Sequence, residues 1–504
     1  MTEQTTPGAL AAAARRFGAR EALVDGTVRL TYEQLLDQVR RCAGFFAARG
    51  VRPGDRVAVN APNTWHWVVA ALGAHYAGAA LVPVNTRFTA AETADILTRS
   101  GAVALVVTGE FLGTDRLAAL QGTGTVPGVV LRIPVEGEEP PREGVTEWSA
   151  LDGFDAAPAP LVSPDDVSDI LFTSGTTGRS KGAMSSHRQA LGVAAAWADH
   201  VALTPEDRYL VVNPFFHSFG YKAGILAALL RGAALVPQAT FDVAAALWII
   251  ERERITVLPG APTVHQSLVD HPRRSEHDLS SLRVAITGAA TVPVSLVERL
   301  GGELGFGTVL TAYGLTEAVV VTMCDAGDDP HTVATTSGRP TAGFEVEIAD
   351  SGEILVRGPN VMLGYLDDPE ATAAAIDTEG WLHTGDVGAL DERGYLRITD
   401  RIKDLYICGG FNVYPAEVEQ VISRLGGVSE VAVVGMPDQR LGEVGLAHVV
   451  PSPGHELDED TVLGHCRELL ANYKVPRRVR FVTELPRNAS GKVLKRVLRE
   501  RTDG

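Results

Sequence analysis

At residues 173–182 the chain reads Thr173-Ser174-Gly175-Thr176-Thr177-Gly178-Arg179-Ser180-Lys181-Gly182, directly after the apolar run Ile170-Leu171-Phe172. This pattern predicts a strand that runs into a loop rich in hydroxyls and glycines. Small residues let a backbone approach a polyphosphate, whose oxygens accept hydrogen bonds from hydroxyl and N–H groups, and Lys181 adds a positive charge. The loop is not a Walker A loop, because Ser180 precedes the lysine and Gly182 follows it. The segment indicates nucleotide binding, and the alternative interpretation is a flexible surface loop.

The composition is that of a globular protein with several domains. A chain of 504 residues exceeds one ordinary core, and its 45% apolar content is typical of soluble proteins. The net charge of −17 disfavours a nucleic-acid partner. The four cysteines follow neither a metal-binding spacing nor a disulfide framework. The start of the chain lacks the pattern of a secretory signal, and the apolar runs are too short to span a bilayer, so we expect a cytoplasmic protein.

Strand-like and helix-like segments alternate along most of the chain, which predicts an α/β architecture. After about residue 340, short alternating strands between Gly and Asp turns predict a small β-rich subdomain, and 404–504 predict a compact α+β unit. Residues 121–165, rich in Pro, Gly and Glu, predict a loosely ordered connection. The expected strands are 56–60, 80–84, 103–107, 209–212, 234–237, 257–259, 284–287, 309–311, 346–348, 353–356, 388–390, 395–398, 430–434, 446–451 and 478–482, and the expected helices include 67–75, 415–424 and 460–471.

Two further motifs suit a nucleotide. Tyr313-Gly314-Leu315-Thr316-Glu317 follows an expected strand and offers a ring that can stack on a purine, a hydroxyl for phosphate and a carboxylate for Mg²⁺. Thr384-Gly385-Asp386 places a carboxylate at a tight turn, which suits two ribose hydroxyls. Taken singly, each motif is equally compatible with an ordinary turn.

Two more motifs lie near the expected domain junction and near the end of the chain. The charged cluster Asp400–Asp404 precedes Gly409-Gly410-Phe411, a combination that suits a solvated hinge followed by a loop lying close to a ligand. A linker followed by a β-turn is the alternative. Residues 486–493 form a second lysine-bearing loop, which carries Lys492. Most lysines near a C-terminus are merely solvated.

Together these five motifs, in this order and spacing, resemble the adenylate-forming superfamily of acyl-CoA synthetases, luciferases and peptide-synthetase adenylation domains. The resemblance covers essentially the whole chain. It implies an α/β fold with a large N-terminal domain of several subdomains (α/β layers plus a small β subdomain, residues 1–402) and a small mobile α+β C-terminal domain (residues 403–504). It also implies a hinge near Lys403, an active site between the domains, and the use of ATP, Mg²⁺ and coenzyme A. Homodimers are common among such enzymes.

The resemblance assigns roles to residues at matching positions. It implies Lys492, Glu317, Thr316 and His217 as catalytic residues, and Thr176 and Glu317 as metal-binding residues. Arg179-Ser180 and Cys408 depart mildly from the usual pattern, and neither change removes a charged group. The nucleotide- and coenzyme-binding residues that it implies are Thr173, Ser174, Gly175, Thr176, Thr177, Gly178, Lys181, Gly288, Ala289, Ala290, Tyr313, Gly314, Asp386, Arg401, Gly409, Gly410 and Phe411.

The implied reaction has two steps. The carboxylate of an acid attacks the α-phosphorus of ATP and gives an acyl-AMP and pyrophosphate. The thiol of coenzyme A then attacks the acyl carbonyl and AMP departs. A non-catalytic nucleotide-binding relative is the opposing hypothesis, and the presence of Glu317, Asp386, Arg401, Lys403 and Lys492 argues against it.

Residues 214–224 resemble the segment that lines the acyl pocket in this superfamily. The implied pocket residues are Phe216, His217, Tyr221, Lys222 and Gly314. The aromatic side chains suit an apolar acid, and the segment contains no acidic residue to pair with an amino group, which disfavours an amino acid.

Four stretches resemble, more finely, actinobacterial ligases that activate the bicyclic propanoate left after degradation of steroid rings A and B. A medium-chain fatty acid or an aryl acid remains the alternative substrate. The stretches are 62–69, 213–224, 332–336 and 406–412.

Overall fold

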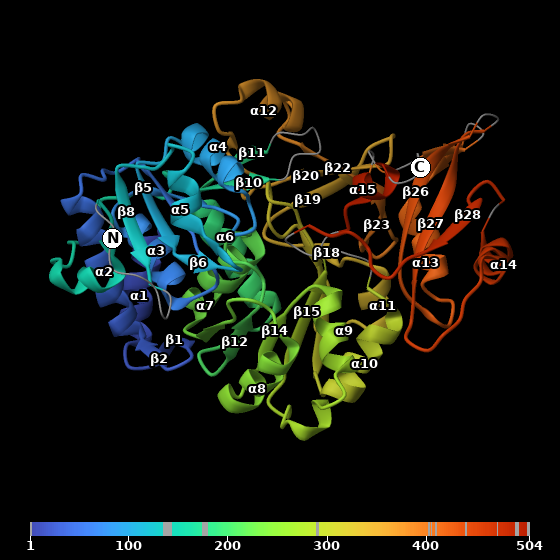
Figure 1. Ribbon diagram of the computed structural model, residues 1–504, viewed down its shortest axis with the longest axis horizontal. Coiled ribbons are helices and arrows are strands. Elements are labelled where there is room, and N and C mark those ends of the chain that lie inside the picture. Colours follow the sequence, from blue (N-terminus) through green and yellow to red (C-terminus); the bar gives the residue numbers. More distant parts are fainter. Residues whose placement is uncertain are drawn as a thin grey trace.

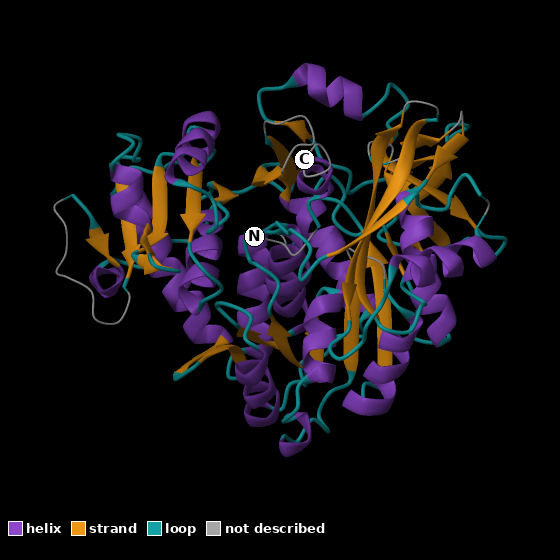
Figure 2. Cartoon of the chain, turned by 45° about the vertical axis from the view of Figure 1, so that its right-hand side comes forward, coloured by secondary structure: helices purple, strands orange, loops and turns teal. Residues whose placement is uncertain are grey.

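The computed structural model describes residues 3–134, 144–173, 180–288, 292–401, 404, 406–408, 411–438, 441–470, 472–488 and 493–500. In this part of the chain the predicted α/β fold is confirmed, with a large N-terminal domain and a small C-terminal domain. In Figure 1 the C-terminal strands and helices, coloured orange to red, lie at one end of the longest axis, opposite the blue and cyan elements. Figure 2 shows helices covering the central sheets.

The first large sheet contains the strand that precedes the phosphate-loop motif. Strands β10, β4, β3, β5 and β8 are parallel, and β11 and β21 extend the β10 edge in antiparallel pairs. The chain passes from β3 to β4 on one side and returns to β5 on the other, so the winding reverses at the carboxyl ends of β3 and β5. Open α/β sheets bind ligands at such a crevice. In pairing order the strands are β21 (Gly364–Tyr365), β11 (Lys181–Ser186), β10 (Val167–Thr173), β4 (Ala80–Pro83), β3 (Arg56–Asn60), β5 (Ala104–Thr108), β8 (Val129–Ile133) and β9 (Thr146–Glu147).

Strand β8 corrects the expectation that 121–165 form a loosely ordered connection. Residues 129–133 pair in register with β5, and most of their side chains are buried. Arg132 interrupts the apolar pattern, but its guanidinium is buried and donates to Glu147 at 3.1 Å. The neighbouring Pro- and Gly-rich residues hid this strand from the sequence analysis.

The second large sheet combines the middle of the chain with its beginning. Strands β12 to β16 pair with one another in parallel, and β1 joins them through a parallel pair with β13 in which Leu23 faces Leu235. In pairing order the strands are β18 (Arg339–Pro340), β17 (Thr322–Met323), β16 (Thr308–Tyr313), β15 (Val284–Gly288), β14 (Val257–Pro259), β12 (Arg208–Val211), β13 (Ala234–Pro237), β1 (Glu21–Asp25) and β2 (Val28–Thr31).

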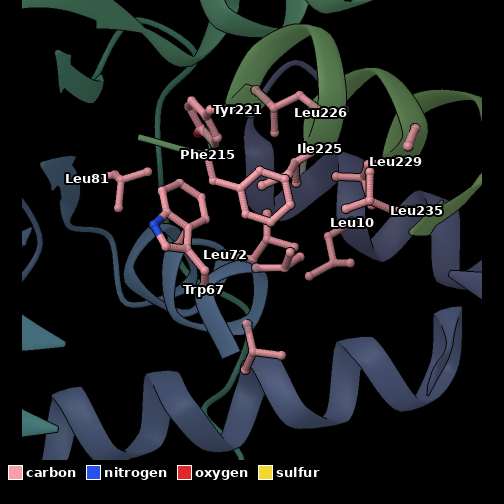
Figure 3. Close-up of a cluster of buried hydrophobic side chains, with 14 of the residues drawn as sticks. Leu10, Trp67, Leu72, Leu81, Phe215, Tyr221, Ile225, Leu226, Leu229 and Leu235 are labelled. Carbon is pink, nitrogen blue, oxygen red and sulfur yellow. The ribbon is translucent and has the colours of Figure 1, made fainter. Parts of the chain in front are cut away.

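Helices cover these sheets, and a continuous apolar core packs between them. Figure 3 shows Trp67 of α3 beside Phe215 and Tyr221, with Leu226 and Leu10 nearby. The centroids of the Trp67 and Phe215 rings lie 5.3 Å apart. The helices are α1 (Thr6–Phe17), α2 (Tyr32–Ala48), α3 (Trp65–Tyr76), α4 (Ala90–Ser100), α5 (Arg116–Gln121), α6 (His187–His200), α7 (Ala227–Arg231), α8 (Val243–Glu253), α9 (Pro262–Asp270), α10 (Val294–Leu304), α11 (Pro330–Thr335) and α12 (Pro369–Ala375), with short helices at η1 (Trp148–Gly153), η2 (Phe219–Leu226) and η3 (Arg274–Glu276) and a small hairpin of β6 (Glu110–Phe111) and β7 (Thr114–Asp115).

The β-rich stretch expected after residue 340 forms an antiparallel sheet, and the end of the chain forms the expected α+β unit. None of the helices built from the described residues has both the length and the apolarity of a membrane span. The antiparallel sheet contains β19 (Glu345–Ile348), β20 (Glu353–Arg357), β22 (Leu382–Leu390) and β23 (Leu396–Arg401). The C-terminal unit contains β24 (Tyr406–Cys408), β25 (Phe411–Val413), α13 (Pro415–Ile422), β26 (Val428–Asp438), β27 (Gly442–Pro451), α14 (Glu459–Leu469), β28 (Arg478–Phe481) and α15 (Lys495–Glu500).

Candidate active site

Two residues expected to flank adenine end neighbouring parallel strands. Gly288 ends β15 and faces Ala312 of β16, and Tyr313 ends β16. A Cβ atom at Gly288 would lie 2.6 Å from the Ala312 carbonyl oxygen, so a larger residue would force the strands apart. The Tyr313 hydroxyl donates a 2.6 Å hydrogen bond to Asp386 Oδ2. The fold therefore brings a residue expected to contact adenine (Tyr313) into contact with one expected to bind the ribose (Asp386).

The turn that carries Asp386 is held rigidly. The Asp386 N–H donates to the Thr384 hydroxyl at 3.1 Å, and that hydroxyl donates to the Ile354 carbonyl at 2.7 Å. Gly385 between them has a φ of +70°, which favours glycine. Asp386 also faces Arg401 across the β22–β23 pair, so the two residues expected to bind the ribose lie directly opposite each other on neighbouring strands. Of Arg401 only the backbone is described.

The loop after β16 is tightly folded around Gly314. A Cβ atom at Gly314 would lie 1.7 Å from the Val319 carbonyl oxygen, which only glycine can avoid. Val319 has a φ of +65°, a costly conformation for a β-branched residue. Such strain persists where the surrounding structure enforces it, commonly beside functional groups. Thr316 and Glu317 lie within this constrained loop, and both are half-buried.

Glu317 and Lys181 both contact Tyr365, a residue that the sequence analysis missed. The Tyr365 hydroxyl donates to Glu317 Oε1 at 2.8 Å, and Lys181 Nζ lies 4.9 Å from the centroid of the same ring. Tyr365 belongs to β21, which pairs with β11, the strand that begins at Lys181. Its local sequence contains no chemical pattern, because its position depends on this long-range strand pair.

The base of the phosphate loop is closed by backbone pairing. Thr173 ends β10 and faces Lys181 of β11, and the Thr173 hydroxyl donates to the Lys181 carbonyl at 3.4 Å. The side chain of Phe411 is not described, although its backbone belongs to β25. The site residues that lie outside the described residues are Ser174, Gly175, Thr176, Thr177, Gly178, Ala289, Ala290, Lys403, Gly409, Gly410 and Lys492.

The residues on either side of the Lys492 loop are anchored. Arg487 and Val493 form an antiparallel bridge, and the Leu494 N–H donates to the Pro486 carbonyl at 2.8 Å. Arg487 also donates to Glu430 at the start of β26 at 2.8 Å. The loop is thereby attached to the C-terminal sheet.

The segment expected to line the acyl pocket is held by an amide that the sequence analysis did not assign. Asn63, buried at 4% exposure, accepts the Phe215 N–H at 2.8 Å and donates to the Asn213 carbonyl at 2.9 Å. Phe216 is half-buried and the side chain of His217 is exposed. The His217 Nδ1 atom accepts the Phe219 N–H at 3.2 Å, which leaves the proton of a neutral imidazole on Nε2.

Protein atoms around His217 disfavour its charged form and lower its pKa, although the ring surface itself is exposed. Both properties are expected of a side chain on the wall of a recess. The segment continues into the π-helix η2, a rare conformation that often occurs at functional sites.

Tyr221 and Lys222 differ from the other expected pocket residues, because the π-helix directs both side chains into the protein. Lys222 is 1% exposed, and its Nζ lies 2.9 Å from Asp169 Oδ1 and donates to the Ser185 hydroxyl at 2.8 Å. The Tyr221 hydroxyl lies 2.6 Å from His75 Nε2. Burial raises the pKa of Tyr221 and lowers that of His75, so both are neutral. Lys222 is therefore bound by protein groups rather than presented to a substrate. The proposed pocket includes neither Tyr221 nor Lys222.

The residues around Glu317 fit a magnesium ion that arrives with a nucleotide. Among the described residues, clusters of three or more His, Cys, Asp and Glu side chains able to hold a metal are absent. Mg²⁺ commonly uses only one or two carboxylates and completes its octahedron with waters and substrate phosphates. One oriented carboxylate beside the phosphate loop therefore suffices.

A second recess lies at the crevice where the first sheet reverses its winding. This cavity of about 370 Å³ is lined by Asn60 at the end of β3, by β5 side chains, and by Arg87 and Arg116. The buried Asn60 Oδ1 atom has no hydrogen-bond partner in the part of the chain that the structure describes. Arg116 donates to the Phe88 carbonyl at 3.1 Å, and burial lowers its pKa. Two guanidinium groups and a hydrophobic wall suit an anionic ligand with an apolar part.

Comparison with known proteins gives consistent matches over the whole chain. The family described as AMP-binding enzyme matches residues 10–366, and the AMP-binding enzyme C-terminal domain matches 417–492. Proteins of Rhodococcus jostii and Mycobacterium tuberculosis, both named 3-(7a-methyl-1,5-dioxo-octahydro-1H-inden-4-yl)propanoyl:CoA ligase, are 62% and 60% identical over 99% of each chain. The ATP-bound crystal structure of MatB from Rhodopseudomonas palustris is 31% identical, with a TM-score of 0.88 over 99% of each chain.

Proposed function

This chain belongs to the family of AMP-binding enzymes, and from that membership we propose how its residues act and which acid it takes. It is an adenylate-forming acyl-CoA ligase. In the first step a carboxylate oxygen attacks the α-phosphorus of ATP, and the bond to the pyrophosphate oxygen breaks. In the second step the coenzyme A thiol loses its proton and attacks the acyl carbonyl carbon, and AMP leaves.

We assign separate residues to the base, the ribose and the phosphates of the nucleotide and to its magnesium ion. Tyr313 and Gly288 flank the base, Asp386 accepts hydrogen bonds from ribose hydroxyls, and Lys181 neutralises phosphate charge. Thr316 binds a phosphate oxygen and Glu317 binds Mg²⁺, which when present neutralises the leaving pyrophosphate. Lys492 stabilises the charge that develops at the α-phosphoryl group.

The residues at the domain junction support a conformational step between the two reactions. We place the domain boundary at 402–403, with Lys403 as the hinge. Strand β23 ends at Arg401 and β24 begins at Tyr406, so this boundary falls between two sheets. Rotation there would withdraw Lys492 and bring Gly409, Gly410 and Phe411 to the acceptor.

The acid is proposed to be the bicyclic diketone propanoate in the names of the two relatives. The observation that carries this proposal is their 60–62% identity over 99% of the chain. The pocket segment supports it, because the half-buried Phe216 and the neutral His217 suit a bulky ring system without a positive charge.

A panel of acids tests this proposal. With MgATP and coenzyme A, kcat/KM for the bicyclic propanoate is expected to exceed that for medium-chain fatty acids, benzoates and malonate by at least about 10-fold, since small differences in an apolar pocket are worth that much. The measurement is AMP formation. Preference for a fatty or aryl acid would contradict the substrate. Nucleotide binding without AMP from any acid would instead support a non-catalytic protein.

The recess lined by Arg87 and Arg116 is proposed to hold the phosphate-bearing end of coenzyme A. Strands β10, β4, β3 and β5 are adjacent and parallel, so the end of β10 and this recess lie on one sheet edge, roughly 15 Å apart at strand spacing. An extended pantetheine arm spans such a separation, which would deliver the thiol to the acyl-adenylate.

Replacing Arg87 with alanine is expected to raise KM for coenzyme A by about 10-fold or more, because a charged hydrogen bond contributes about 1.5–3 kcal/mol. Pyrophosphate release in the absence of coenzyme A should be unchanged, since it reports the first step alone. Arg87→Lys, which retains the charge, is the matched control and should lose less. Equal losses in both steps would argue against this site.

A further inference from the structure

The contacts around Tyr365 carry an inference that rests on the proposed roles of Glu317 and Lys181. One side chain contacts both groups expected to bind MgATP: its hydroxyl donates to Glu317 Oε1 at 2.8 Å, and its ring lies 4.9 Å from Lys181 Nζ. The ion pairs seen among the described residues do not join Glu317 to Lys181. One aromatic side chain thus contacts two groups of opposite charge, one through its hydroxyl and the other through its ring face.

The backbone of Tyr365 is fixed on several sides. Tyr365 faces Ala183 across the β11–β21 pair, and the Leu366 N–H donates to the Gly182 carbonyl at 2.8 Å. The Tyr365 N–H donates to the Thr372 hydroxyl at 2.9 Å. Because these bonds tie β21 to the strand that begins at Lys181, the ring keeps its place relative to the base of the phosphate loop.

The phenol is well suited to a permanent donor role. Its hydroxyl donates to Glu317 Oε1 at 2.8 Å, a contact that occupies one of the two carboxylate oxygens. A carboxylate held through one oxygen keeps its other oxygen free and oriented. Groups that hydrogen-bond to metal ligands in this way typically contribute 10- to 100-fold to metal affinity.

We propose that Tyr365 is a positioning residue that orients Glu317 for Mg²⁺ and prevents Glu317 and Lys181 from pairing with each other before the nucleotide binds. The hydroxyl performs the first task. The ring performs the second, since a cation over an aromatic face is attracted to the ring without losing its charge. The two tasks can therefore be separated by substitution.

Tyr365→Phe keeps the ring and removes only the hydroxyl. In calorimetric titrations of ATP at graded Mg²⁺ concentrations, this variant is expected to need about 10-fold more Mg²⁺ for half-maximal ATP affinity. Its ATP affinity at saturating Mg²⁺ should match that of the unmodified protein. An unchanged or lower Mg²⁺ requirement would overturn the orienting role.

Tyr365→Leu removes the ring as well. Lys181 and Glu317 can then pair directly, and this pair must be broken by the incoming nucleotide. ATP affinity is expected to fall by about 10-fold even at saturating Mg²⁺. If it equals that of Tyr365→Phe, the separating role is wrong.

Two controls distinguish these roles from a general structural effect. Tyr395 has similar surroundings elsewhere: its hydroxyl donates to Asp328 at 2.5 Å, and Arg393 lies 4.7 Å from its ring centroid. Tyr395→Phe should leave the Mg²⁺ requirement unchanged, and a shift there would overturn the proposal. In a Glu317→Gln background Tyr365→Phe should add nothing further, because the hydroxyl acts through that carboxylate. Failure of the unmodified protein to bind MgATP would refute the proposed function itself.

Discussion

Replacing Lys492 with alanine is expected to slow acyl-adenylate formation by about 10²–10³-fold, the usual effect of removing one group that stabilises developing charge in a water-poor site. The flanking residues are anchored by the Arg487–Val493 bridge and by the bond from Leu494 to Pro486. These contacts do not involve the lysine side chain, so the substitution should remove a charge without unfolding the loop. The measurement is pyrophosphate release from ATP and the bicyclic acid in the absence of coenzyme A.

The second half-reaction provides an internal comparison for this variant. Prepared acyl-AMP and coenzyme A should still give the thioester at nearly the unmodified rate, because the lysine acts only on the α-phosphoryl group of ATP. Lys495, which pairs with Glu419 at 2.8 Å, provides a matched control. Lys495→Ala removes the same charge from the neighbouring helix and should leave adenylation intact. Equal loss in both half-reactions would contradict the proposed role of Lys492.

A large loss of stability is expected when Asp169 is replaced by alanine. Asp169 and Lys222 are 0% and 1% exposed, and their pair ties the π-helix η2 to β10. Without Asp169 the ammonium stays buried without a counter-charge, and breaking a buried pair in this way costs about 3–5 kcal/mol. Unfolding in guanidinium chloride, followed by tryptophan fluorescence, should show a free energy of unfolding lower by that amount.

A double variant tests whether the uncompensated charge causes this loss. Lys222→Met with Asp169→Asn buries no charge, and the asparagine oxygen can still accept the Ser168 hydroxyl, which lies 2.6 Å from Asp169 Oδ2. Most of the lost stability should return, because neutral replacements of buried ion pairs are often tolerated. If the double variant is as unstable as Asp169→Ala, the packing of the aspartate matters more than its charge.

Most of the strands could be predicted from the sequence because the relevant signals are local, and the enzyme class because five local motifs together resemble a known superfamily. A hydroxyl- and glycine-rich loop after an apolar strand, or a carboxylate at a Gly-Asp turn, is visible within a few residues. The structure then brings several of these motifs together, as in the hydrogen bond from Tyr313 to Asp386. The roles of the individual site residues, the domain boundary, the use of Mg²⁺ and coenzyme A, a homodimer and a cytoplasmic location stay predictions.

Other features depend on long-range contacts that local patterns do not encode. Tyr365 reaches Glu317 and Lys181 only because β21 pairs with β11. Lys222 was expected in the pocket because residues 214–224 resemble the pocket-lining segment, but a π-helix, which leaves no distinct residue pattern, directs the side chain inward to Asp169. Strand β8 escaped notice because Pro- and Gly-rich residues surround it and a buried arginine interrupts its apolar run.

The position of β1 has a consequence for synthesis of the chain. Its Leu23 faces Leu235, so during synthesis β1 can pair early with its neighbour β2 but must wait for its other partner, β13. Contacts between residues so distant in sequence slow folding, and until they form the apolar strand is exposed to other chains. One edge of β1 therefore depends on delayed pairing during translation, so we expect production at low temperature to raise the yield of folded protein.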